Sequence, residues 1–377
     1  MDFWRREAEV GGGEGGGEGG GGEMCELVGE EMATLVSNGV LVGFAGQALL
    51  SLCLSAWVFF LTKHGNMDIT YPEGSMKREI ERKRLDFVSN ILMIGSDIQS
   101  TLGISYMITT FSLSSIMDLY HLHLVFDIVS FVGVSNTAAL VCWRFVRAKI
   151  DASATNPHSK NTGGRISYWN GRYRATFFFV ILYLALLILL CVRLNEWAPD
   201  TEPGRCYFSS LVTSPHASHP GADQIYVSIT GSWLIVVILS SVFVGVRGRR
   251  FILILVSLHF PLHLYMAIAL RQANQGKFEG EVKHENEWDF GQTTAVVLLG
   301  IAVVELIAKG REYYRFERYV TKHGVLPSEH ANGQGPSKDV EAVGNGITYP
   351  LDALSGKDEQ PPEARHLLSK RHATSPP

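Results

Sequence analysis

The sequence predicts an all-α integral membrane protein: a bundle of seven transmembrane helices, with the N-terminus outside the cell and the C-terminus in the cytosol. Three observations predict it. Only 19% of the 377 residues are charged, and these residues gather at the two ends and in a few connections. Between them lie seven apolar segments, each long enough for the roughly 20 apolar residues that a bilayer core requires. The third observation is an alternation of basic residues from one connection to the next.

That alternation fixes the number of spans. When the connections are assigned to alternate sides of a seven-span chain, one side holds 21 Lys and Arg residues and the other holds 7. Cytoplasmic loops of membrane proteins carry the excess of Lys and Arg. The bias has the same sign at every connection, whereas a six-span chain would scramble it. We therefore predict seven spans with an external N-terminus.

The seven spans differ in how many charged residues they contain. The fourth is the clearest, because an uncharged run lies between Arg174 and Arg193, which can extend their charged ends to the two interfaces. The second and third are the weakest, because they contain Asp97 and Asp127. One ionisable group in a span is tolerated when it faces other helices. The predicted spans are 41–62, 87–111, 119–143, 175–192, 225–246, 251–270 and 290–308.

The remaining parts of the chain lie outside the predicted bilayer. Residues 1–35, rich in Gly and Glu, are expected to form a disordered external tail, and residues 323–377 a disordered cytosolic tail. Residues 311–322 place apolar and basic side chains on opposite faces, which predicts an amphipathic helix at the membrane interface. Cys25 and Cys206 would both be external, and a disulfide between them is a hypothesis.

Polar residues inside the spans are the candidate functional groups. Buried ionisable side chains are costly in hydrocarbon, so each needs a partner or a role. Asp127 lies inside the third span, and His259 and His263 lie four residues apart, on one face of the sixth, with Pro261 between them. The candidate intramembrane polar site is Asp97, Gln99, His121, Asp127, His259, His263 and Gln292.

Three interpretations of this site stay open. Its members could simply bridge neighbouring helices, or they could bind a small ligand, an ion or protons. They could also hold zinc, for which His259 and His263 are the candidate ligands, although a proline between two histidines disturbs their helical register. No catalytic residue and no cofactor is predicted. Asp97 and Asp127 are the residues expected to matter to folding or to a ligand response.

The net charge of −4 argues against nucleic acid as a partner. Motifs of nucleotide binding and of hydrolytic catalysis do not occur on suitable elements of the chain. We favour a sensor-like or receptor-like protein whose polar intramembrane pocket binds a small ligand. A membrane-embedded zinc hydrolase and a transporter or scaffold are the alternatives. The partners expected are the lipid bilayer, preferably the plasma membrane, and an unidentified cytosolic protein.

Three short blocks of the sequence form a set. They are Ser96-Asp97-x-Gln99-x-x-x-Gly103, Tyr120-His121 with Asp127, and Glu285-Asn286-Glu287-Trp288 with Phe290-Gly291-Gln292. Together they resemble the signature of a large family of multi-span membrane proteins of filamentous fungi, over about residues 36–310. The resemblance implies architecture and membrane location but no activity. The chain has His123 where that family often has Gln, and Ser130 where it often has Trp, which makes His123 a poor candidate for a metal ligand.

Overall fold

The computed structural model of the chain describes residues 33–61, 75–154, 171–195, 220–244, 248–274 and 290–324. The regular elements in these ranges are eight α-helices, and seven of them are long and apolar enough to cross a membrane. The predicted seven-helix membrane bundle is therefore confirmed, while the side of the membrane on which each terminus lies stays a prediction. The helices are α1 Ala33–Val36, α2 Asn38–Leu61, α3 Met76–Leu113, α4 Leu119–Ala154, α5 Gly171–Asn195, α6 Gly221–Phe243, α7 Arg249–Asn274 and α8 Phe290–His323.

Helix α5 shows why the apolar segments fold as they do. Its residues between Arg174 and Arg193 carry no charge, and at 1.5 Å per residue they cover about 27 Å, close to the thickness of a hydrocarbon core. An α-helix satisfies all the backbone hydrogen bonds of such a segment internally, which hydrocarbon requires. Arg193 donates a hydrogen bond to the carbonyl of Met117, 2.8 Å away, and so ties the end of α5 to the turn between α3 and α4.

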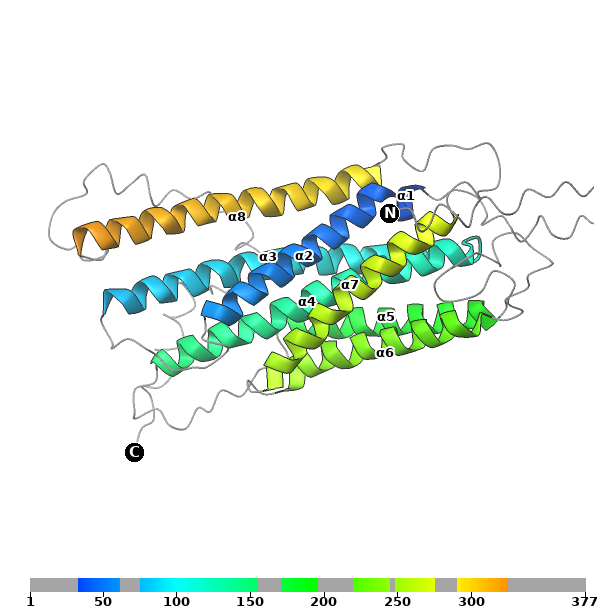
Figure 1. Ribbon diagram of the computed structural model, residues 1–377, viewed down its shortest axis with the longest axis horizontal. Helices are drawn as coiled ribbons and strands as arrows, with labels where there is room; N and C mark the ends of the chain where they lie inside the picture. Colours follow the sequence, from blue (N-terminus) through cyan, green and yellow to red (C-terminus); the bar gives the residue numbers. More distant parts are fainter. Residues whose placement is uncertain are drawn as a thin grey trace, which may run out of the picture. The chain divides into compact units, whose positions relative to one another are not determined.

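Helix α4 is the centre of the bundle. Every side chain from Leu119 to Cys142 is buried, and the helix contacts α2, α3, α5, α6 and α7. Figure 1 shows it running between α2 and α3 on one side and α5 and α6 on the other, with α8 at an edge. An ordinary lipid-facing helix is apolar towards lipid, but α4 is surrounded by protein on all sides and can therefore carry polar groups.

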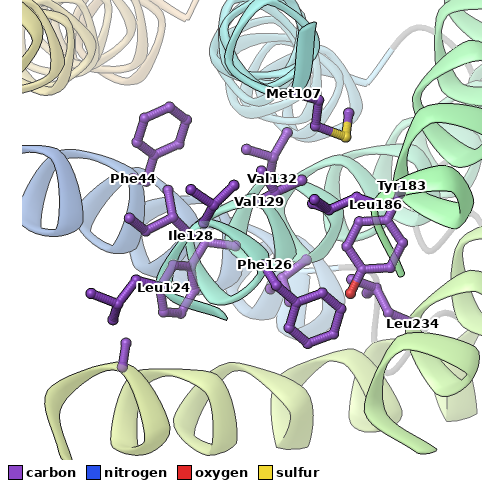
Figure 2. Packing of buried hydrophobic residues seen from close by; sticks show 14 of the residues in the cluster. Phe44, Met107, Leu124, Phe126, Ile128, Val129, Val132, Tyr183, Leu186 and Leu234 are labelled. Carbon is purple, nitrogen blue, oxygen red and sulfur yellow. The ribbon is translucent and has the colours of Figure 1, made fainter. Parts of the chain in front are cut away.

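The apolar core is built from the side chains that α4 presents to its neighbours. Figure 2 shows these side chains meeting residues of α2, α3, α5 and α6. Phe126 of α4 stacks on Tyr183 of α5, with 5.6 Å between the ring centroids. Gly133 allows Leu234 of α6 to approach α4 closely, since a Cβ at that glycine would lie 2.8 Å from the leucine side chain. The labelled members are Phe44, Met107, Leu124, Phe126, Ile128, Val129, Val132, Tyr183, Leu186 and Leu234.

A layer of small polar side chains links α4 to three other helices. Ser135 bonds to Ser51 of α2, with 2.7 Å between the hydroxyl oxygens. Asn136 accepts a hydrogen bond from Ser96 of α3 at 3.3 Å and donates one to Thr176 of α5 at 3.2 Å. Such bonds stabilise helix pairs in lipid, where polar groups have few other partners. This layer fixes the register of α2, α3, α4 and α5.

Helix α8 packs against α2 through glycines. A Cβ placed on Gly43 would lie 2.6 Å from the Cβ of Ala295 and 2.9 Å from its backbone, so the two helices approach closely at this glycine. Gly39 and Gly46 make similarly close approaches to Gln292 and Leu299. Small residues spaced four apart are the usual device for close packing of membrane helices. The rest of α8 inside the predicted span is largely exposed, as a helix at the edge of a bundle in lipid would be.

The charged ends of α3 and α8 make a second contact, beyond the predicted spans. The guanidinium of Arg84 donates one hydrogen bond to the Tyr313 hydroxyl at 2.8 Å and one to Glu317 at 3.0 Å. Phe87 stacks parallel to the Tyr313 ring, with 5.8 Å between centroids. These residues hold the end of α8 against α3, so α8 is attached at both ends of its length.

Residues 311–322, predicted as an amphipathic helix at the membrane interface, are helical in the structure, and their place at the interface stays a prediction. The structure continues α8 without a break from Phe290 to His323. Both α3 and α8 extend past the predicted spans, because good helix formers continue a helix into water. The last turn of α8 belongs to a second unit that begins at Arg318, within which the rings of Tyr319 and His323 lie 4.7 Å apart.

Most of the two predicted tails lies outside the described residues. The short helix α1, Ala33–Val36, occupies the end of the segment that was assigned to the N-terminal tail. Cys25 and Cys206, the predicted disulfide, also lie outside the described residues, so that pairing stays a prediction.

The glycine contact predicts a large difference between two substitutions. Replacing Gly43 by Val should destabilise the protein by about 1–3 kcal/mol, because the added atoms would overlap the backbone of Ala295 and force α8 away. Gly300 of α8 has no atom within 4 Å of where its Cβ would lie. Gly300→Ala should therefore be neutral or slightly stabilising. Thermal unfolding of the purified protein in detergent measures both, and equal midpoints for the two variants would contradict the close contact.

Candidate functional site

Three helices meet at one buried carboxylate. Asp127 of α4 lies with its Oδ1 2.5 Å from Nδ1 of His263 on α7. The hydroxyl of Tyr226 on α6 donates to the same oxygen at 3.3 Å and lies 3.4 Å from the histidine nitrogen. The side chains of Asp127 and His263 have no exposed surface. With Asp127 ionised, His263 donates its Nδ1 hydrogen, which leaves Nε2 as an acceptor. We call these three residues, together with His259, the Asp127 cluster.

Helical spacing brings His259 into the cluster. It precedes His263 by four residues, so both imidazoles lie on one face of α7, and their ring centroids are 4.4 Å apart. Pro261 between them does not interrupt α7, which is helical from Arg249 to Asn274. His259 also lies beside the indole of Trp233 on α6, with 5.7 Å between the centroids.

Several polar atoms of this region have no hydrogen-bond partner among the described residues. They are both ring nitrogens of His259, Nε2 of His263, Oδ2 of Asp127 and the indole nitrogen of Trp233. A buried polar group without a partner costs about 1–3 kcal/mol, and native structures contain few of them. Five such atoms from four neighbouring side chains mark the part of the bundle where a polar guest would be most stabilised.

Aromatic side chains enclose the cluster. Phe126 packs edge-on against His263, with 5.5 Å between the centroids. His123, one turn before Asp127 on α4, lies 5.8 Å from the Tyr226 ring. On the α5 side the Tyr183 hydroxyl lies 2.8 Å from that of Ser130. These rings exclude water, so electrostatic interactions inside the cluster are strong.

Asp97, the other intramembrane acid, lies elsewhere. Its carboxylate accepts hydrogen bonds from Nε and Nη2 of Arg172 at 3.2 and 3.0 Å. Arg172 is in the first turn of α5, so this ion pair lies where α5 begins, and both side chains are substantially exposed. Gln99, half a turn further along α3, is buried and donates to the backbone carbonyl of Phe44 at 3.2 Å. Both residues join α3 to a neighbouring helix.

Two further predicted site residues also lie apart from the Asp127 cluster. His121 in the first turn of α4 binds Asp118, which directly precedes that helix, with 2.5 Å between Nδ1 and Oδ2. Gln292 is buried on α8, where its side chain meets Gly39 of α2. Of the seven predicted residues, the structure thus brings together Asp127, His259 and His263.

The sequence analysis did not identify the polar residues that α6 contributes near the Asp127 cluster. Span five was read as an uncharged segment beginning at residue 225, although Asp223, Tyr226 and Trp233 follow each other at three and seven residues and so lie near one face of a helix. The structure begins α6 at Gly221 and buries Asp223 within its first turn. A polar stripe on an otherwise apolar helix was the signal that could have found them.

The metal hypothesis can be compared with the geometry directly. Within the parts of the chain that the structure describes, no three His, Cys, Asp or Glu side chains are arranged so that they could hold a metal ion. His259 and His263 form a pair, and a catalytic zinc site takes three protein ligands.

Comparison of the chain with protein-family models, with curated proteins and with solved structures finds no match.

The two intramembrane acids should respond differently to removal. Asp127→Ala leaves His263 and Tyr226 buried without their acceptor, and removing one partner of a buried pair costs about 3–5 kcal/mol. Asp97→Ala removes an exposed ion pair, for which the expected cost is about 0–1 kcal/mol. Thermal unfolding midpoints in the same detergent compare the two variants. Equal losses would show that Asp127 contributes no more than a surface contact.

Proposed function

We propose that the chain is a sensor-like multi-pass membrane protein whose Asp127 cluster responds to a small ligand or ion. The observation that carries the proposal is the combination of a buried carboxylate shared by three helices with neighbouring polar atoms that lack partners. A purely structural polar link would satisfy its own hydrogen-bonding groups, as the layer around Asn136 largely does. The Asp127 cluster instead leaves hydrogen-bonding atoms available for a small ligand or an ion.

The arrangement is also suited to transmit a response. A change in the hydrogen bonds of Asp127 alters the contact of α4 with α6 and with α7 at once. Packed helices shift between discrete arrangements by about 1–2 Å, and a ligand moves that equilibrium through its different affinity for the two states. The helical ends beyond the bilayer, which include the Arg84–Tyr313–Glu317 contact, would present the change to a partner.

The two alternatives have less support. A zinc hydrolase needs a third protein ligand beside His259 and His263, and the described residues include no group of three such side chains arranged to hold a metal ion. A transporter usually shows two similar halves with broken helices at matching positions, whereas the sequence has one proline break, at Pro261, and no internal repeat.

The orientation and the membrane are part of the same proposal. The excess of Lys and Arg on alternate connections supports an external N-terminus and a cytosolic C-terminus. We place the protein in the plasma membrane, and within the family of fungal multi-span proteins that its three sequence blocks resemble.

Ligand-dependent stability tests the sensor function. The purified chain in detergent is heated with alkali cations, ammonium, small primary amines and buffers of different pH. A ligand at 100 times its dissociation constant stabilises a protein by about 2.7 kcal/mol, which raises the unfolding midpoint by several degrees. We expect at least one condition to give such a shift in the wild-type protein and no shift in Asp127→Asn.

The matched control is Asp97→Asn, which makes the same substitution at the other acid of the second and third predicted spans without touching the cluster, and it should keep the shift. If no condition separates the wild-type protein from Asp127→Asn, the cluster is a structural link and the sensor function is wrong.

A further inference from the structure

We infer that the ligand of the Asp127 cluster is a proton, taken up by the paired imidazoles of His259 and His263. The inference rests on the proposed sensor function and narrows it to one chemical species. It follows from the space, the charge and the hydrogen-bonding groups of the cluster.

Space is the first argument. The unpartnered atoms of Asp127, His259 and His263 have almost no surface that a water molecule could touch. Asp127 and His263 are 0% exposed and His259 is 1% exposed. Any molecule of the size of water or larger would therefore have to displace side chains of the packed bundle. A proton adds to a nitrogen lone pair and needs no cavity.

Charge is the second argument. An ionised Asp127 gives its contact with His263 a charge of −1 in a region walled by aromatic and aliphatic side chains. Isolated buried charges are unstable in such surroundings. When hydronium transfers one proton to an imidazole, an N–H bond forms, an O–H bond of hydronium breaks and a water molecule remains in the solvent. The carboxylate and the imidazolium together are then neutral. The existing hydrogen bond of 2.5 Å then joins two opposite charges.

The hydrogen-bonding groups are the third argument. His263 uses Nδ1 for Asp127, so its Nε2 is the free lone pair that a proton can occupy. His259, whose ring centroid lies 4.4 Å away, has one nitrogen that accepts and one that donates, and neither has a partner in the described residues. A proton shared between the two rings would give a partner to Nε2 of His263 and to one nitrogen of His259.

Every helix around the cluster contributes to the charge that the proton would meet. Asp223 and Tyr226 of α6 and His123 of α4 interact electrostatically with Asp127, and Tyr183 of α5 lies behind Ser130. The negative charges of Asp127 and Asp223 attract a proton, and a charged His123 would repel it. Two further groups lie beyond the cluster: the Asp118–His121 pair at the start of α4, and Arg271 of α7, which binds the Val36 carbonyl.

The fluorescence emission of Trp233 can report whether His259 and His263 are protonated. Its indole lies beside His259, and an imidazolium next to an indole alters the indole's emission far more than a neutral imidazole does. The chain has seven tryptophans, so the signal of Trp233 is the emission of the wild-type protein minus that of Trp233→Phe. The full chain in lipid nanodiscs is titrated downward from about pH 8, through the range near pH 6.5 where an unperturbed imidazole changes charge and on to the lowest pH at which the helices stay intact.

We expect the Trp233 signal to change reversibly with the shape of a one-proton titration. His259→Gln and His263→Gln keep hydrogen-bonding capacity but cannot hold the charge, and either should abolish the titration. Asp127→Asn removes the favourable negative charge and should move the midpoint down by about 1–3 pH units. The matched control is His323→Gln, which removes an exposed histidine at the end of α8 and should leave the titration unchanged.

Two results would contradict proton uptake by His259 and His263. The first is a Trp233 signal that does not change with pH while circular dichroism shows the wild-type helices intact. The second is a titration that persists in both His259→Gln and His263→Gln, which would place the titrating group elsewhere. If a cation or amine still stabilises the wild-type protein through Asp127, the sensor function survives without the proton. If neither experiment gives a response, both proposals fail.

Discussion

A carboxylate inside a hydrocarbon core must be neutralised or hydrogen-bonded, and Asp127 meets this requirement through His263 and Tyr226. That requirement places α6 and α7 against α4 at fixed depths. It also explains why α4 is the helix that protein surrounds on all sides, since a lipid-facing helix could not carry the acid. The pure apolar segments, such as α5, are then left for the lipid-facing positions, where apolar surface costs nothing.

The bundle contains two polar layers of different character. Ser135 and Asn136 lie eight or nine residues from Asp127, which is about 13 Å along α4. Their hydrogen bonds reach Ser51, Ser96 and Thr176, and this layer joins α2, α3, α4 and α5 through neutral groups. The Asp127 layer carries ionisable groups with unpartnered atoms. The first kind of layer stabilises helix packing, and the second can change its state when a proton or ion binds.

The sequence was sufficient for the seven helices, because hydrophobic length and charge alternation are properties of segments and are read locally. It was sufficient for the pairing of His259 with His263, since helical spacing fixes their common face. It could not separate Asp97 from Asp127. Both are single acids in apolar spans, and only the packing of α3 against α5 shows that Arg172 reaches Asp97. The same applies to α8, because the position at which a charged helix ends is not set by the membrane boundary.

The division into layers also indicates which helices would move. The neutral layer holds α2, α3, α4 and α5 together, and glycines and Arg84 attach α8 to α2 and α3. Helices α6 and α7 are linked to α4 through Tyr226 and His263, whose bonds depend on the charge of the cluster. A change there acts on these two helices while the others keep their neutral contacts. Since three residues separate the described ends Val244 and Gly248, α6 and α7 are constrained to respond as a pair.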